Sequence, residues 1–129
     1  MGYQPIPEED EAIARGVIGA AIEVHRVLGP GFLESVYERA LMHELQLRGL
    51  PAARQHALLV IYKELPIQEH RLDLLVGGRV IVEVKAVDSI APIHEAQLLS
   101  YLKASSLRVV LIINFNVVML RDGIRRLVR

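Results

Sequence analysis

The chain lacks several residue types and patterns that define particular chemistries. It contains no cysteine, which excludes disulfide bonds, thiolate zinc sites, iron–sulfur clusters and cysteine nucleophiles. No apolar run approaches the roughly 18 residues that a membrane-spanning helix needs. The first residues are acidic and contain prolines, unlike a signal peptide. We therefore expect a soluble cytoplasmic protein without a membrane partner.

The chain also has no excess of either charge, because 15 basic residues balance 15 acidic ones. A domain that coats nucleic acid is usually basic, so the overall charge does not favour such a coat. Acidic residues gather near the start, where they complement the positive end of the first expected helix. Arginines gather near the end, either as a phosphate-contacting patch or on a solvated last strand. The two clusters are Glu8, Glu9, Asp10 and Glu11, and Arg121, Arg125, Arg126 and Arg129.

The length and the hydrophobic content of 52% predict one folded domain over residues 1–129. Apolar periodicity and turn residues predict the order ααβββαββ, which is typical of an α/β sandwich or an α+β domain. The expected helices cover residues 7–28, 32–48 and 92–105, and the expected strands cover residues 54–63, 67–76, 80–87 and 107–115, with a last hairpin around Asp122 and Gly123.

Charged residues interrupt an otherwise apolar strand in the middle of the chain. Glu83 and Lys85 lie within residues 80–87, and Asp73 belongs to the preceding expected strand. Burying charged groups is costly unless they are paired or hold a metal. Two acids and a lysine can bind a divalent cation and position a water, which is the chemistry of phosphodiester cleavage. The alternative is a structural ion cluster that joins Asp73 to Lys85 and Arg71 to Glu83.

The register of the hairpin decides whether the two acids meet. A two-residue loop would separate Asp73 from the face that carries Glu83. A three-residue loop over residues 77–79 places Asp73 opposite Glu83 and leaves the other face apolar, with Leu72 and Leu74 on it. We predict this second register, which puts the two Cβ atoms about 5 Å apart. Two like charges that close need a cation, a proton or a nearby lysine.

Other catalytic arrangements find no support in the sequence. The five histidines are scattered without an H-x-x-x-H pair, so a histidine zinc centre is not expected. The pair Gly77-Gly78 marks a turn rather than a phosphate-binding loop. No serine lies in a recognisable nucleophile elbow.

Three motifs together resemble a known family. Asp73 followed by Glu83-Val84-Lys85 is similar to the D…ExK signature of the PD-(D/E)XK nuclease superfamily. Residues 31–37 read GxxExxY and residues 97–101 read QxxxY. With the stretches LGPGFLESVYERAL, RLDLLV, HEAQLLSYLK and LIINFNV, they closely resemble the GxxExxY protein family, a small branch related to RecB-type nuclease domains. The resemblance covers roughly residues 12 to 128.

The resemblance implies a restriction-endonuclease-like α/β core with a central mixed sheet flanked by helices. It also implies Mg²⁺ or Mn²⁺ held by Asp73, Glu83 and Glu34, with the backbone carbonyl of Val84 as a further ligand. Lys85 would orient or deprotonate the attacking water and stabilise developing charge. The residues that organise the site or contact substrate would be Gln97, Tyr101 and Tyr37.

The position of Glu34 on its helix can be tested by periodicity. At 100° per residue, Tyr37, Leu41 and Leu45 fall within about 60° of Glu34. Glu34 is therefore predicted to lie on the apolar stripe, where an inward carboxylate needs a partner. A metal or Lys85 fits that need, and an arginine is the alternative.

The predicted function is a Mg²⁺-dependent nuclease that hydrolyses phosphodiester bonds, with DNA as the expected substrate. One alternative is a catalytically inactive nucleic-acid-binding or protein-interaction module with the same fold. Another is a hydrolase of RNA or of another phosphoester. The short chain leaves little room for a recognition domain, so a partner protein or a homodimer is a further hypothesis. An exposed edge strand near residues 117–128 is the surface expected to pair.

Overall fold

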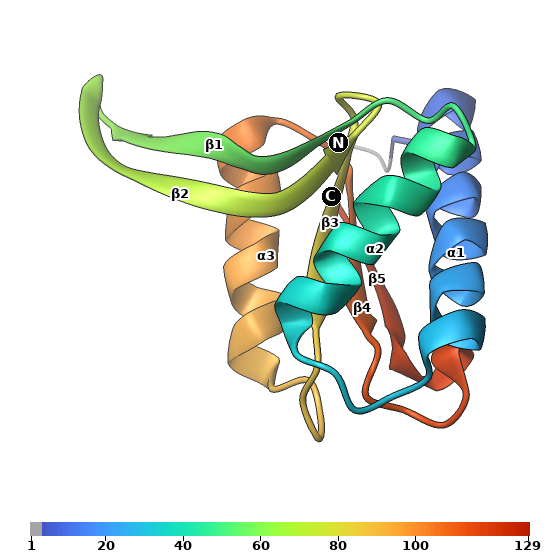
Figure 1. Ribbon diagram of the computed structural model, residues 1–129. Coiled ribbons are helices and arrows are strands. Elements are labelled where there is room, and N and C mark those ends of the chain that lie inside the picture. The colour runs from blue at the N-terminus through green and yellow to red at the C-terminus, as the bar shows by residue number, and fades with distance from the viewer. Residues whose placement is uncertain (1–3) are drawn as a thin grey trace.

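The computed structural model describes residues 4–129 as a five-stranded mixed sheet with helices on both faces (Figure 1). The strands lie in the order β1-β2-β3-β4-β5, which is also their order along the chain. The predicted order of helices and strands is confirmed. The elements are α1 (Glu8–Leu28), α2 (Glu34–Leu47), β1 (Ala52–Tyr62), β2 (Leu65–Val76), β3 (Val80–Lys85), α3 (Pro92–Ser105), β4 (Val109–Asn114) and β5 (Ile124–Val128), with a short 3₁₀ helix at Leu120–Gly123.

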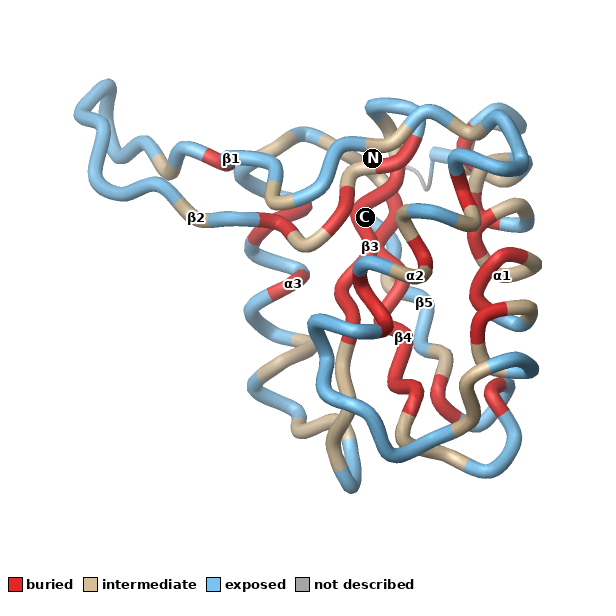
Figure 2. Tube along the Cα trace, viewed as in Figure 1, coloured by how far each residue is buried: buried red, intermediate tan, exposed pale blue. Residues whose placement is uncertain are grey.

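The sheet is parallel only between β3 and β4 and antiparallel elsewhere. Parallel neighbours need a crossover, which α3 provides between these two strands. Both strands are almost fully buried, because helices cover them from both sides (Figure 2). This explains why the sequence of β4 is a continuous apolar run rather than an alternating one.

Alternate residues of β3 face different helical layers. Val80, Val82 and Val84 pack in the core cluster that contains residues of α1 and α2. Ile81 packs in the cluster that contains Leu98, Tyr101 and Leu102 of α3. Because side chains alternate along a strand, Glu83 and Lys85 also face the α3 side.

The charged termini of the chain are joined to each other. Arg126 of β5 donates to Glu11 of α1 at 2.6 Å, and Arg79 pairs with the buried Asp10. The acidic first turn of α1 therefore binds arginines as well as complementing the helix dipole. All four C-terminal arginines are exposed, and Arg126 among them is engaged by Glu11.

The hairpin of β1 and β2 extends beyond the body of the protein (Figures 1 and 2). β2 pairs with β3 only through residues 74–76, whereas it pairs with β1 from residue 65 to residue 76. We call the projecting part, residues 56–71, the arm. No helix within residues 4–129 combines the length and apolar character needed to cross a bilayer.

Candidate metal and catalytic site

The hairpin between β2 and β3 has the predicted three-residue loop. The ladder pairs Val76 with Val80 and Leu74 with Val82. The backbone ladder ends at this pair, and hydrogen bonds to side chains take its place beyond it. The backbone N–H of Asp73 donates to Glu83 Oε2 at 3.1 Å, and the N–H of Val84 donates to Asp73 Oδ2 at 2.9 Å. The two acidic side chains are therefore brought together between the strands, as the register argument predicts.

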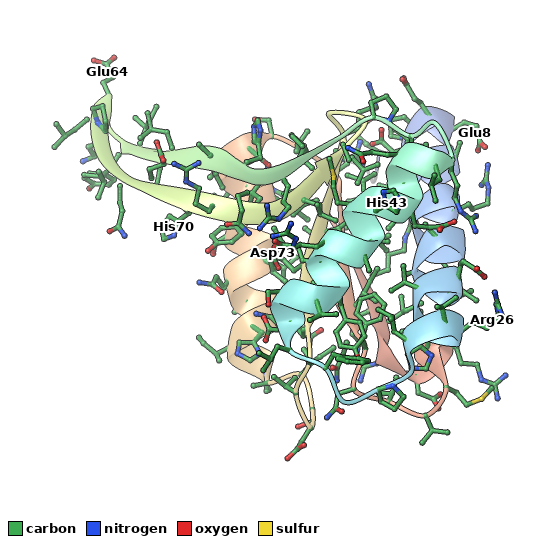
Figure 3. All side chains as sticks on the ribbon, viewed as in Figure 1. Glu8, Arg26, His43, Glu64, His70 and Asp73 are labelled. Atoms are coloured by element: carbon green, nitrogen blue, oxygen red, sulfur yellow. The ribbon has the colours of Figure 1, made fainter. Side chains whose placement is uncertain are left out.

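The predicted apolar face ends one residue earlier than expected. Leu74 packs with the cluster of α1 and α2, but Leu72 packs with the cluster of α3. The expectation that Leu72 and Leu74 share a face is wrong. The carboxylates of Asp73 and Glu83 accept hydrogen bonds from backbone N–H groups that would otherwise join the two strands. β2 is therefore free to twist away from β3 at Asp73. This twist starts the arm, and Figure 3 shows Asp73 at its base with His70 further out.

Burial and the neighbouring acid change the protonation of Glu83. The residue is only 7% exposed. Loss of solvent raises its pKa to about 8, and the charge of Asp73 and a hydrogen bond to its side chain add to that rise. The backbone N–H of Asp73 and the more distant charge of Lys85 oppose it. At neutral pH the metal-free pair therefore holds a proton.

The alternative of a structural ion cluster is contradicted. Within residues 4–129, neither Asp73 nor Glu83 forms an ion pair with a lysine or an arginine. Arg71 instead pairs with Glu69 at 3.1 Å and donates to the carbonyl of Gln55. The half-buried Lys85 lies two residues beyond Glu83 on the same side of β3. The negative charge of the two acids is therefore to be balanced by another cation or removed by protonation.

The whole arrangement can be compared with known proteins. The chain matches the family model described as the PD-(D/E)XK nuclease superfamily over residues 11–127. It belongs to the PD-(D/E)XK nuclease superfamily. Comparison with curated proteins and with solved structures gives no match. The superfamily resemblance predicted from the motifs is confirmed, as is the mixed sheet flanked by helices.

The donor set of this PD-(D/E)XK chain fits a divalent cation. Two carboxylates on adjacent strands are the kind of oxygen ligand that Mg²⁺ and Mn²⁺ prefer. Burial, with the charge of Asp73, raises the pKa of Glu83, and neither acid has an ion-pair partner within residues 4–129. Within the described residues, no group of three or more His, Cys, Asp or Glu side chains is positioned to hold a metal. Mg²⁺ suits such a sparse site, since it commonly keeps several waters and uses one or two carboxylates.

The QxxxY motif contributes one residue to this site. Tyr101 is buried, and its pKa is raised by loss of solvent and by the charges of Glu83 and Asp73. Its hydroxyl lies 3.5 Å from Nδ1 of His70. Gln97 is exposed, although it lies one helical turn before Tyr101. Tyr101 thus borders the carboxylate pair, and Gln97 is free to meet a ligand outside the core.

The prediction that Glu34 faces inward is wrong. It is the first residue of α2 and is exposed. The first turn of α2 is exposed, and the buried residues of the helix begin at Tyr37. Periodicity gives the direction of a side chain around the helix but not the point where the helix leaves the core. Glu34 therefore does not complete an acidic triad with Asp73 and Glu83.

The acid that α2 does bury is Glu38. It accepts hydrogen bonds from Arg54 Nε and Gln55 Nε2, both at 2.7 Å. The sequence indicates the burial of Glu38, because the apolar Leu45, seven residues later, lies only about 20° from Glu38 around the helix axis. Glu38 fixes β1 where Gln55 adopts a φ of 54°.

Tyr37 is buried in the core and is hydrogen-bonded to the loop before α2. Its ring stacks on Phe115 with centroids 4.6 Å apart, and its hydroxyl donates to the carbonyl of Gly29 at 2.6 Å. The hydroxyl also accepts from the N–H of Phe32 at 3.1 Å. The tyrosine of the GxxExxY motif thereby ties the loop before α2 to the core.

One further histidine differs from the rest. Nδ1 of His94, in the first turn of α3, is buried without a hydrogen-bond partner in the described residues. A buried polar atom without a partner is uncommon. His94 lies two turns before Tyr101 on the same side of α3.

Proposed function

We propose that this protein is a metal-dependent nuclease that hydrolyses phosphodiester bonds of DNA. One observation carries the proposal: Asp73 and Glu83 are held side by side, with the pKa of Glu83 raised to about 8 by burial and by Asp73. Membership of a nuclease superfamily gives that pair its chemical context. A carboxylate as buried as Glu83, beside a second acid and without an ion-pair partner, is costly, and binding of a cation would offset that cost.

Asp73, Glu83 and the carbonyl of Val84 would hold Mg²⁺ or Mn²⁺. The bound ion would supply Lewis-acid stabilisation of negative charge on the phosphate. The two hydrogen bonds to backbone N–H groups fix the carboxylate oxygens, so little reorganisation is needed when a ligand arrives.

Lys85 would act on the water and on the phosphate. Its ammonium lies on the face of β3 that carries Glu83, on a strand whose C-terminal end is anchored by the bond from the N–H of Phe115 to the carbonyl of Lys85. Three N–H donors can orient a water and stabilise the charge that develops on a phosphoryl oxygen. Tyr101, whose phenol feels the charge of both acids, would position a substrate phosphate or the lysine.

The test combines metal binding with cleavage. Asp73→Asn keeps an oxygen that can accept from Val84, so it removes the charge while preserving the hydrogen bond. Isothermal titration with Mg²⁺ and Mn²⁺ is expected to show binding to the wild type and its loss in Asp73→Asn. Linear, nicked and single-stranded DNA should be cleaved by the wild type alone.

The outcomes separate the competing functions. Cation binding that survives Asp73→Asn would contradict the assignment of the site. DNA binding and cation binding without cleavage would favour the inactive binding module. A parallel series with RNA of the same sequence distinguishes the two nucleic acids, since preferential RNA cleavage would overturn the choice of DNA.

A further inference from the structure

The arm carries an apolar surface that the other described residues, within 4–129, leave uncovered. Figure 2 shows both of its strands as exposed over most of their length. Patches of this kind on a protein surface commonly mark interaction sites. A two-stranded ribbon without further support is also only marginally stable in water. The exposed large side chains are Leu59 (47% exposed), Ile61 (58%), Tyr62 (62%), Leu65 (61%) and Ile67 (55%).

The two edges of the arm differ in chemistry. In the arm, β2 contains Pro66, Glu69 and Arg71, and prolines and charges on an edge discourage pairing with another strand. β1 reads Ala-Leu-Leu-Val-Ile-Tyr over residues 57–62, with no charge and no proline. Within the described residues, β1 pairs with β2 alone, so its outer edge presents unpaired backbone donors and acceptors. The edge of β1 is thus unprotected.

The opposite edge of the sheet is protected. β5 reads Ile-Arg-Arg-Leu-Val, and both arginines are exposed at the edge. Arg126 is further engaged by Glu11. The surface near residues 117–128 is therefore less suited to pairing than the edge of β1.

We propose that the outer edge of β1 pairs antiparallel with the same edge of a second copy of this chain. A two-fold axis perpendicular to the sheet leaves each side chain on the same face of the sheet in both copies. The axis must therefore pass between the two copies of one and the same residue. Centring it on Leu59 places Leu59 beside Leu59 of the second copy and uses the whole uncharged run. The two arms then form one four-stranded ribbon.

Charge and area agree with a second copy as the occupant. In this register, Glu64 at the tip of one arm is level with Arg54 of the second copy, which pairs with Glu38 but keeps 42% of its side chain exposed, and no like charges oppose each other. The charges of the two basic residues of the arm, Lys63 and Arg71, balance those of its two acidic residues, Glu64 and Glu69. The arm therefore has no net positive charge that would attract a phosphate backbone. The exposed apolar side chains of β1 itself, Leu59, Ile61 and Tyr62, border the partner strand in each copy and offer on the order of a few hundred Å², toward the ~800 Å² per partner of a standard interface.

The pairing would also organise the site. Asp73 belongs to β2, the strand that continues into the arm, so joined arms would hold two Asp73–Glu83 pairs in one particle. A particle with two sites can act on two strands of a duplex. This consequence rests on the proposed function, but the pairing itself does not.

Opposite charges at the central position test the pairing directly. Wild-type protein is expected to sediment as a dimer at micromolar concentrations. Leu59→Lys and Leu59→Glu should each weaken dimerisation by roughly tenfold or more, because they place like charges side by side. An equimolar mixture of the two variants should restore the dimer as a mixed pair. Leu47→Lys, on the exposed end of α2, is the control and should dimerise as the wild type does.

A cysteine at the same position gives a second readout. The chain has no cysteine, so Leu59→Cys introduces the sole thiol. Mild oxidation should join two copies through it, whereas Leu47→Cys should remain mostly unlinked. A monomeric wild type, a dimer that survives Leu59→Lys, or a mixture that fails to pair would each overturn the proposal. Open-ended aggregation of the wild type in place of a dimer would also overturn it. Circular dichroism of each variant distinguishes lost pairing from lost folding.

Discussion

Glu83 accepts a hydrogen bond from the backbone of Asp73 at 3.1 Å, and Asp73 accepts one from the neighbour of Glu83, Val84, at 2.9 Å. This reciprocal exchange fixes two carboxylates at the point where β2 leaves β3. It satisfies backbone donors that the ladder no longer serves, and it holds two acids together before any cation arrives. The pKa of Glu83 is raised first by its burial and then by this nearby carboxylate.

The stability of the metal-free protein should therefore depend on Glu83. Its pKa is about 8 in the folded chain, against 4.5 for an unperturbed glutamate carboxyl. The folded state holds an extra proton between these values, so the free energy of unfolding should fall as pH rises from about 4.5 to 8. Glu83→Gln, which mimics the protonated acid, should lack this decline and be more stable at pH 8.5 by on the order of 2–4 kcal/mol.

Denaturant unfolding of both proteins in EDTA between pH 5 and pH 9 measures this difference. All other titratable groups are common to the two proteins, so the difference between the curves reports the titration of Glu83 together with its coupled neighbour Asp73. Parallel curves would show that Glu83 ionises normally in the fold.

Cation affinity should rise with pH over the same interval. A divalent ion and the proton compete for the acidic pair, so the apparent affinity for Mg²⁺ should increase up to about tenfold per pH unit below pH 8 and level off above it. Titration in two buffers of different ionisation enthalpy should reveal the released proton. Glu34→Gln serves as the control: Glu34 is exposed, and its replacement should leave the affinity unchanged. An equal loss in Glu34→Gln and in Asp73→Asn would place Glu34 among the ligands.

Lys85 should separate catalysis from metal binding. Lys85→Met retains the length of the side chain and removes its charge. Cleavage is expected to fall by roughly 10²–10⁴-fold, the usual contribution of a general acid–base or charge-stabilising group. Mg²⁺ affinity, measured by titration, should not fall, because the acids remain. A parallel loss of metal affinity and activity would mean that Lys85 mainly maintains the site.

Tyr37 should matter for stability and not for chemistry. Tyr37→Phe keeps the ring stacked on Phe115 but removes the hydroxyl that serves Gly29 and Phe32. The free energy of unfolding should drop by about 1–3 kcal/mol, measured by urea unfolding. Tyr62→Phe, at an exposed position of the arm, should change it by less than about 0.5 kcal/mol. A cleavage defect in Tyr37→Phe without a loss of stability would argue for a direct role.

Local patterns predicted much of the fold and the centre of the site. The apolar periods of α1 and β4, the loop of residues 77–79 and the alternation around Glu83 each depend on near neighbours in the chain. The register of a short hairpin follows from turn length and polarity, both of which the sequence displays. Asp73 and Glu83 could therefore be paired without coordinates.

Positions that depend on distant packing could not be predicted in this way. Glu34 and Glu38 lie on one side of α2, and only the placement of the helix against the sheet exposes the first and buries the second. Leu72 left its predicted face because side-chain hydrogen bonds ended the ladder at Asp73. The link between Tyr101 and His70 joins elements that are separated in sequence.

The sequence by itself determined the helices and strands and the register that pairs Asp73 with Glu83, because each follows from short-range periodicity and turn chemistry, and it carried the motifs that resemble the superfamily. Tertiary structure alone decided that Glu83 is buried enough to retain a proton, that Glu34 stands outside the acidic pair, and that the β1 edge of the arm is open. Burial, desolvation and strand twist result from contacts between elements that are distant in the chain, and no local pattern records those contacts.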